Sequence, residues 1–214
     1  MRRRTALALC GSVGAASLSG CLGVFDDSPR DNGDPDESAP DTSPPEGYVR
    51  PYSEPEVVPT EFRCPDGAFI RPSRWYSPDG LAYGDTEKFA LHVSDCSFEY
   101  GETADIVLRN VHSERAGTGN PDKHNLEIYT EAGWTEVRRY TNVSTPLPIT
   151  DELVEHQPCE GFEWEIELTE EGIPAGHINE RDLQVCADLV SGRYRFVFGS
   201  IDMGVAVEFD LTVE

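Results

Sequence analysis

Residues 192–213, GRYRFVFGSIDMGVAVEFDLTV, contain two runs in which large apolar side chains occupy every second position. The first run has aromatic residues at positions 194, 196 and 198. The second has Val, Val, Phe, Leu and Val at the odd positions from 205 to 213. Because successive side chains of a β-strand point to opposite faces, each run predicts a strand with one face in a core and the other nearer water.

The same alternation of apolar residues at every second position recurs in the chain before these runs. It places apolar residues at alternate positions in 89–93, 104–108 and 162–168, and residues 126–137 predict a hairpin that turns at 131–133. We expect a further turn at Gly117-Thr118-Gly119 and at most one short helix over 179–189, capped by Asn179. About seven strands joined by turns predict an all-β fold, an antiparallel β-sandwich formed by one domain over residues 61–214.

The segment Asp188-Leu189-Val190-Ser191-Gly192-Arg193-Tyr194 places a tyrosine at the start of the first quoted strand. This arrangement resembles the tyrosine corner of immunoglobulin-like (Ig-like) sandwiches, in which the tyrosine hydroxyl bonds back to nearby backbone. The alternative is a tyrosine that only packs at a strand start. The surrounding strands favour the corner.

A wider resemblance covers about residues 88–214. Its motifs are Phe98-Glu99-Tyr100-Gly101-Glu102, Ile106-Val107-Leu108-Arg109-Asn110, Leu126-Glu127-Ile128-Tyr129 and Gly133-Trp134. Their order resembles a bacterial Ig-like domain of exported lipoproteins, of haloarchaeal type. The resemblance implies an Ig-like sandwich and no activity, because its motifs are structural and a fold does not determine a function. Residues 61–87 lie outside it.

The N-terminal residues predict export and a lipid anchor. Arg2 to Arg4 precede an apolar stretch over 6–18, which is too short for a membrane-spanning helix of about 20 residues. Leu18-Ser19-Gly20-Cys21 resembles the lipobox of exported lipoproteins, which implies that residues 1–20 are a signal peptide and that Cys21 carries lipid. The paired arginines also resemble a twin-arginine export signal. We therefore expect the protein on the outer face of the cell membrane, held there through Cys21.

The charge balance is strongly acidic. The chain has 40 Asp and Glu residues against 17 Lys and Arg, a formal net charge of −23, and the lysines are Lys88 and Lys123 alone. At molar salt the Debye length falls to about 3 Å and self-repulsion is largely screened. Such an acid-rich, lysine-poor composition resembles that of halophilic archaeal proteins. Without a basic stripe to offset phosphate charge, nucleic acid is not an expected partner.

Residues 21–60 are expected to form a disordered spacer between the lipid and the domain. Positions 22–60 hold ten acids and eight of the sixteen prolines, with few large apolar residues. Such a segment buries too little apolar surface to offset the entropy of ordering it, and proline and like charge favour extension. A solvated tether is therefore favoured over a calcium-binding segment.

Four cysteines remain in the exported domain: Cys64, Cys96, Cys159 and Cys186. An even number in an exported chain predicts two disulfides. We favour the pairs Cys64–Cys96 and Cys159–Cys186, which would tie the segment before residue 88 to the sandwich. A Cys96–Cys186 bridge stays an alternative. Zinc binding is less favoured because the chain has no CxxC spacing.

No motif predicts catalysis, a metal or a cofactor. A blue-copper site is not predicted, because Cys159 has no following histidine until His177. Met203 is also far in the sequence from Cys159 and Cys186. The histidines stand singly, and GxSxG, GxGxxG and P-loop motifs are absent. Asn142-Val143-Ser144 is a candidate N-glycosylation site.

The sequence thus predicts a non-catalytic binding or structural module of a halophilic cell envelope. We expect it to recognise an unidentified envelope protein through loops or a sheet face. The alternative is a proteinase inhibitor, which the Ig-like resemblance implies because some bacterial Ig-like domains of similar strand order resemble such inhibitors. In that case the loop from Asn110 to Lys123 would enter a protease cleft.

Overall fold

The computed structural model describes residues 42–59, 70–141, 149–185 and 187–214. In that part of the chain the regular structure is β-strand apart from one short 3₁₀ turn, η1 (Pro78–Gly80), and no α-helix occurs. The all-β prediction is therefore confirmed. The strands are β1 (Ala82–Tyr83), β2 (Phe89–Val93), β3 (Ser97–Glu99), β4 (Thr103–Asn110), β5 (Ala116–Thr118), β6 (His124–Thr130), β7 (Gly133–Glu136), β8 (Arg138–Tyr140), β9 (Val154–His156), β10 (Gly161–Glu167), β11 (Leu183–Val185), β12 (Gly192–Phe198) and β13 (Val205–Thr212).

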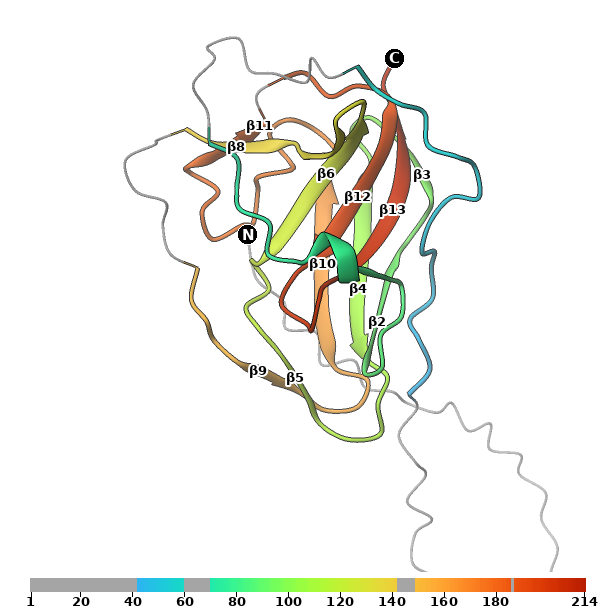
Figure 1. The fold of residues 1–214 in the computed structure, drawn as a ribbon, viewed down its shortest axis with the longest axis vertical. Helices are drawn as coiled ribbons and strands as arrows, with labels where there is room; N and C mark the ends of the chain where they lie inside the picture. The colour runs from blue at the N-terminus through green and yellow to red at the C-terminus, as the bar shows by residue number, and fades with distance from the viewer. Residues whose placement is uncertain (1–41, 60–69, 142–148, 186) are drawn as a thin grey trace, which may run out of the picture.

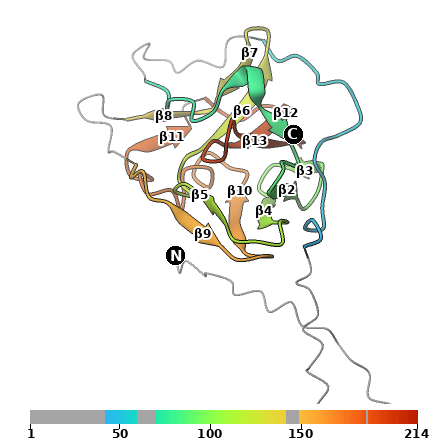
Figure 2. The same cartoon turned by 60° about the horizontal axis from the view of Figure 1, so that its bottom comes forward.

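Two main sheets face each other (Figures 1 and 2). The large sheet has the order β1-β13-β12-β6-β7, with β3 also paired to β13, and the small sheet has the order β10-β4-β2. One apolar core lies between them and takes fully buried side chains from both, such as Leu91 and Ile106 of the small sheet and Phe196 and Phe209 of the large sheet. Two short ribbons, β11-β8 and β5-β9, complete the described structure.

The pairings are mainly antiparallel, as expected. β12 pairs with β13 and with β6 over most of its length, and β6 turns into β7 so that Thr130 lies opposite Gly133. Gly133 has φ +86°, a conformation that glycine adopts at little steric cost. The predicted hairpin over 126–137 is confirmed. β1 and β3, in contrast, run parallel to β13, so the edge of the large sheet is mixed.

The short helix that the sequence allowed over 179–189 does not occur in the described residues of that segment. Leu183 and Val185, which are buried, alternate with Gln184 and form β11, which pairs with β8. The residues just before β11 form turns. The alternation of apolar and polar side chains therefore indicated a strand here, as it did in the longer strands.

The tyrosine-corner prediction is confirmed in its hydrogen bond. The Tyr194 hydroxyl donates to the Val190 carbonyl oxygen at 2.9 Å, and the Tyr194 side chain is fully buried. Its ring stacks on Phe209 of β13, with 6.1 Å between ring centroids. The corner therefore fixes the start of β12 against its neighbour.

The large sheet is covered on both faces, which the alternating pattern did not predict. Arg193, Arg195 and Glu208 were expected nearer water, yet they are 2%, 5% and 8% exposed. Residues 70–83 cover this second face: Tyr76 packs with Val197 and Ala206 there. Part of the segment that lay outside the Ig-like resemblance thus belongs to the domain.

Polar side chains on the covered face satisfy one another. The Glu127 carboxylate, which is fully buried, accepts hydrogen bonds from Arg195 Nε at 2.7 Å and from the Tyr76 hydroxyl at 2.8 Å. Arg195 also donates to the Tyr83 hydroxyl at 3.0 Å, and its guanidinium lies 4.2 Å from the centroid of the Trp134 ring. Burial, followed by the charge of Glu127, raises the pKa of Tyr76 to about 12. The hydroxyl therefore stays protonated and donates to the carboxylate.

Residues 48–58 form a strap along the outside of the domain (Figure 1). Tyr48 exchanges two backbone hydrogen bonds with Val93 of β2, and the Glu208 amide donates to the Val49 carbonyl at 2.8 Å. Val58 forms a parallel bridge with Thr130. Residues 48–58 of the spacer expected over 21–60 are therefore paired with the sheets. The proline-rich composition of the strap predicted disorder, because it does not show which backbone groups pair with the sheets.

The described cysteines do not bond to each other. Cys96 and Cys159 are both half-buried, and no disulfide joins them. Cys64 and Cys186 lie outside the described residues, as do Cys21 and Asn142. The pairs Cys64–Cys96 and Cys159–Cys186 stay predictions.

Removal of Glu127 should be costly, because it leaves Arg195 buried without its carboxylate. We expect Glu127→Ala to lower the free energy of unfolding by about 3–5 kcal/mol. The control is Glu155→Ala, which removes a carboxylate from the exposed Arg115–Glu155 ion pair and should cost below about 1 kcal/mol. Urea unfolding in molar KCl measures both. Equal losses would show that the buried pair does not stabilise the covered face.

Candidate ligand-binding pocket

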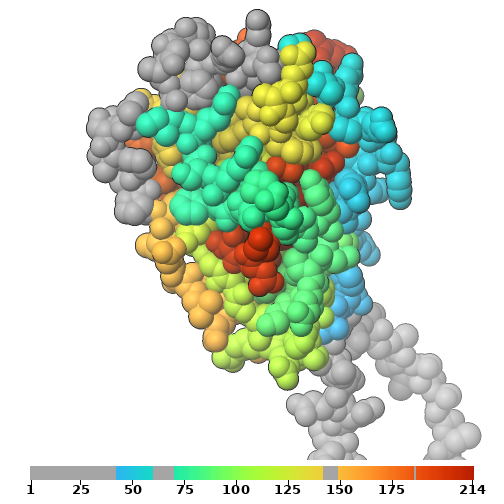
Figure 3. Space-filling model, in the orientation of Figure 1, coloured from blue at the N-terminus to red at the C-terminus, as the bar shows by residue number. Residues whose placement is uncertain are grey.

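A cavity of about 320 Å³ opens between the loop that joins β12 to β13 and the β5–β9 ribbon. We call it the lysine pocket, because it is lined by Lys88 and Lys123, the two lysines of the chain. The space-filling view shows the β12–β13 loop, in red, at the surface between the teal segment of η1 and the yellow-green segment near β5 (Figure 3). The volume lies at the lower end of the usual range for small-molecule sites, about 300–1,000 Å³.

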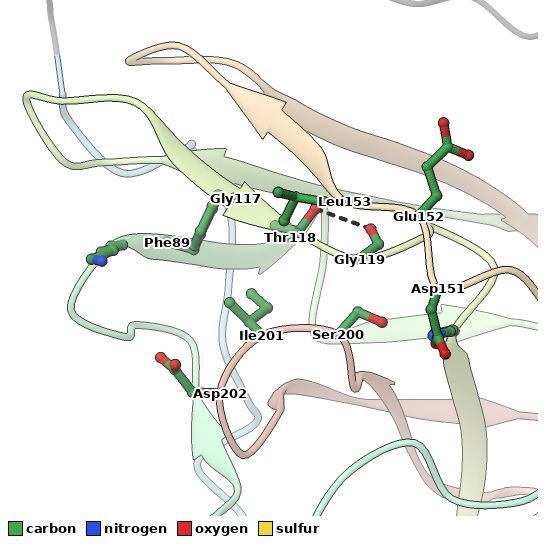
Figure 4. A pocket seen from close by; sticks show the side chains of 12 residues that line it. Phe89, Gly117, Thr118, Gly119, Asp151, Glu152, Leu153, Ser200, Ile201 and Asp202 are labelled. Carbon is green, nitrogen blue, oxygen red and sulfur yellow. Dashed lines mark hydrogen bonds and ion pairs between the residues drawn. The ribbon is translucent and has the colours of Figure 1, made fainter.

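The Gly117-Thr118-Gly119 segment forms one wall of this pocket. It was expected to be a turn, but its first two residues belong to β5 and pair with β9. The Gly119 amide donates to the Ser200 carbonyl at 3.0 Å, and a Cβ atom at position 119 would lie 2.7 Å from Ser200 Oγ. Glycine is therefore required for the close approach of the two loops. Figure 4 shows Thr118 donating from its hydroxyl to the Gly119 carbonyl beside Ser200, at 3.1 Å.

Lys123 forms the inner cationic wall. Its backbone is held at both ends, since its amide donates to the Asn120 carbonyl and its carbonyl accepts from the Gly199 amide. Its side chain is 11% exposed, and its ammonium lies 5.3 Å from the centroid of the Trp75 ring. The aliphatic stem is thus buried while the charge faces the pocket.

Asp151 supplies the ion-pair partner of this buried ammonium. Its side chain is 96% exposed and comes from the segment just before β9. The hydrogen bond from Lys123, together with its charge, lowers the pKa of the Asp151 carboxyl. The pair therefore joins a fixed, buried cation to an anion on the solvent side.

The remaining lining combines acidic and apolar groups. Asp202 lies on the β12–β13 loop with φ 40°, a left-handed conformation that aspartate tolerates better than most residues. Figure 4 shows Asp151 and Asp202 on opposite sides of the Ser200–Ile201 edge, with Glu152 directed away from it. Leu153 is 72% exposed at the rim. The pocket thus offers charges of both signs and a short apolar surface.

A buried polar cluster lies directly behind Lys123. Arg138 donates to the His124 carbonyl at 2.7 Å and lies 3.1 Å from His124 Nε2, while its guanidinium also bonds Glu136. The His124 and His177 rings are in edge contact, with 5.3 Å between centroids. Burial, followed by the charge of Arg138, holds the pKa of His124 well below its usual value. The cluster therefore contains neutral imidazoles beside a charged guanidinium.

Sequence reasoning did not find the lysine pocket. It named both lysines as rare, but the hairpin β12–β13 and the ribbon β5–β9 bring them together only in three dimensions. The scarcity of lysine was the available signal, because two such residues in one cavity are unexpected in so acidic a chain.

Stability should fall as the pH drops through the titration of His177. His177 Nε2 contacts the Asp122 carbonyl at 3.0 Å and Nδ1 accepts from the Asn179 amide at 3.0 Å, an arrangement that suits the neutral ring. Burial, followed by Arg138, lowers its pKa from 6.5 to about 4. The unfolded chain therefore binds a proton first, and stability that is complete above pH 6.5 is lost towards pH 4, by on the order of 3 kcal/mol.

Urea unfolding at intervals across this pH range measures the effect. The variant His177→Gln can form the same two hydrogen bonds without a titrating ring, so its stability should depend less steeply on pH. Identical slopes in the wild type and the variant would contradict the assignment.

No family model, curated protein or solved structure shows significant similarity to this chain. Within the described ranges, no three His, Cys, Asp or Glu side chains are grouped so that they would hold a metal ion. No helix in the same ranges is long and apolar enough to cross a membrane. An account of function therefore starts from the pocket and the sequence motifs.

Proposed function

We propose that the protein is an exported, lipid-anchored, non-catalytic binding module of a halophilic cell envelope, with the lysine pocket as its recognition site. The observation that carries the proposal is the convergence of both lysines of a strongly acidic chain on one cavity. The lipobox-like sequence at Cys21 supports the anchor. The acidic surface supports function in concentrated salt.

The pairing of Thr118 with His156 favours binding over catalysis. Thr118 Oγ1 lies 2.9 Å from His156 Nε2, a distance suited to a nucleophile and its base. Both residues, however, are 3% exposed or less, and the Thr118 hydroxyl donates to the Gly119 carbonyl. The hydroxyl is thus engaged with both the Gly119 carbonyl and His156 Nε2, so the pair is best explained as a structural contact.

The inhibitor alternative requires the loop from Asn110 to Lys123 to project into a protease cleft. The middle of this loop is paired with β9, and the Asn110 side chain, fully buried, donates to the carbonyls of Glu114 and His156. Asn120 and Asp122 are 7% exposed each. These contacts hold the loop against the domain and favour the pocket as the recognition element.

Replacement of Cys21 tests the anchor. We expect Cys21→Ala to move the protein from the membrane to the medium, because lipid chains contribute about 0.8 kcal/mol per buried methylene and no other part of the proposed mature chain is assigned to the bilayer. Cell fractionation in a halophilic host measures this. The control is Cys10→Ala, within the proposed signal peptide, which should leave the protein on the membrane. Membrane retention of Cys21→Ala would refute the anchor.

Co-purification tests recognition. Tagged full-length protein extracted from native membranes in molar KCl should retain a bound partner or solute that mass spectrometry identifies at a fixed stoichiometry. The variant Lys123→Met keeps the buried aliphatic stem and removes the charge, so it should lose that species. A species retained equally by both proteins would place recognition elsewhere on the domain, and the absence of any retained species would contradict a binding role.

A further inference from the structure

We infer that the lysine pocket binds a small zwitterionic solute, an α-amino acid with an aliphatic side chain, and that Asp151 occupies the place of the ligand carboxylate until the ligand displaces it. The inference rests on the proposed binding function and adds the chemical class of the ligand. Three features of the pocket carry it: a buried cation, a separate acidic group and an apolar rim.

The first feature is the Lys123–Asp151 pair. The Lys123 side chain is 11% exposed and held in the wall, whereas the Asp151 side chain is 96% exposed. The Asp151 carboxylate is largely hydrated, so its exchange for a ligand carboxylate replaces one charge-assisted contact of Lys123 with a similar one and costs little. A ligand carboxylate that enters the pocket can therefore replace Asp151 on the ammonium, and Asp151 can move into water.

The second feature is the acidic group on the other side of the pocket. Asp202 lies on the β12–β13 loop, and Figure 4 shows it separated from Asp151 by Ser200 and Ile201. A carboxylate at that place attracts an ammonium group. With a cationic contact at one end and an anionic contact at the other, the pocket suits a ligand that carries both charges.

The third feature is the apolar surface between these ends. Leu153, which is 72% exposed at the rim, supplies most of it, while Ile201 and Phe89, 6% and 1% exposed, form its floor. Burial of an aliphatic side chain against them contributes roughly 25 cal/mol per Å² of apolar area removed from water. The volume of about 320 Å³ admits a single amino acid and not a folded partner.

The charge composition disfavours simpler ligands. A lone anion such as phosphate would meet Asp151 and Asp202, and a lone divalent cation would meet Lys88 and Lys123. Either ligand would have unfavourable contacts of like charge. A zwitterion matches both signs.

Calorimetric titration of the full-length protein in detergent and molar KCl tests the inference. The probes are leucine, 4-methylpentanoate, which lacks the ammonium group, and 3-methylbutylamine, which lacks the carboxylate. We expect leucine to bind with a Kd of about 1 μM or lower and each analogue to bind about tenfold more weakly or worse. Failure of leucine to bind, or binding of one analogue as tight as that of leucine, would overturn the inference.

Two variants test the displacement. Lys123→Met should weaken leucine binding about tenfold or more, whereas Asp151→Asn should strengthen it, because the competing carboxylate is gone. The control Asp105→Asn removes an exposed acid on β4, away from the pocket, and should change nothing. The asparagine oxygen of Asp151→Asn can still accept from the Lys123 ammonium, so this variant is expected to fold even if Lys123→Met does not. Weaker or unchanged binding by Asp151→Asn would refute the internal carboxylate.

The outcome is separable from that of the proposed function. A protein that stays on the membrane through Cys21 and loses its retained species in Lys123→Met, yet does not bind leucine, retains the binding role and refutes the amino-acid ligand. Retention of Cys21→Ala on the membrane would instead count against the proposed function.

Discussion

The buried contact between Arg195 and Glu127 allows the large sheet to be covered on both of its faces. In a sandwich of this size one face of each sheet usually meets water, which favours polar side chains there. Here that face is covered, and its guanidinium and carboxylate satisfy each other, with the Tyr76 and Tyr83 hydroxyls as further partners. A charge buried without such partners would cost several kcal/mol, so covering this face requires the network.

The lysine pocket depends on that covering layer. Residues 70–83 place Trp75 beside the Lys123 ammonium, and the Trp75 amide donates a hydrogen bond to Asn125 Oδ1 at 3.2 Å. Lys123 directly precedes β6 and Asn125 lies near its start, whereas Ser200 and Asp202 belong to the loop after β12. The surroundings of the pocket thus combine residues 70–83, which have no alternating pattern, with residues next to β6 and β12.

Alternation of side chains was a good guide to where strands occur and a poor guide to what covers them. The runs at 192–198 and 205–212 are strands at nearly the expected positions. Aromatic and branched residues at every second position can all be buried together only in an extended strand. The same pattern placed Arg193 and Arg195 nearer water, since it contains no information about the residues that pack above them. Gly117 and Thr118 resembled a turn by composition, yet they form a strand because they pair with β9, which is distant in the sequence.

The candidate site was hidden for a related reason. Lys88 and Lys123 are far apart in the sequence, and only the loop after β12 and the β5–β9 ribbon bring them to one cavity. The lipobox-like sequence, by contrast, is local, so it was visible without a structure. Local chemistry can be inferred from a sequence, whereas a cavity built from four segments requires the fold.

The strap over 48–58 also determines how the domain would respond to tension. If lipid holds Cys21, any pull on the cell-surface side reaches the folded part through Tyr48, whose two backbone hydrogen bonds to Val93 measure 2.8 and 2.9 Å. The next attachments, at Val49 and Ser53, join the strap to the paired strands β13 and β12 through Glu208 and Arg193. Force would therefore be shared among successive bonds in two sheets, and the pocket-forming loops would carry little of it.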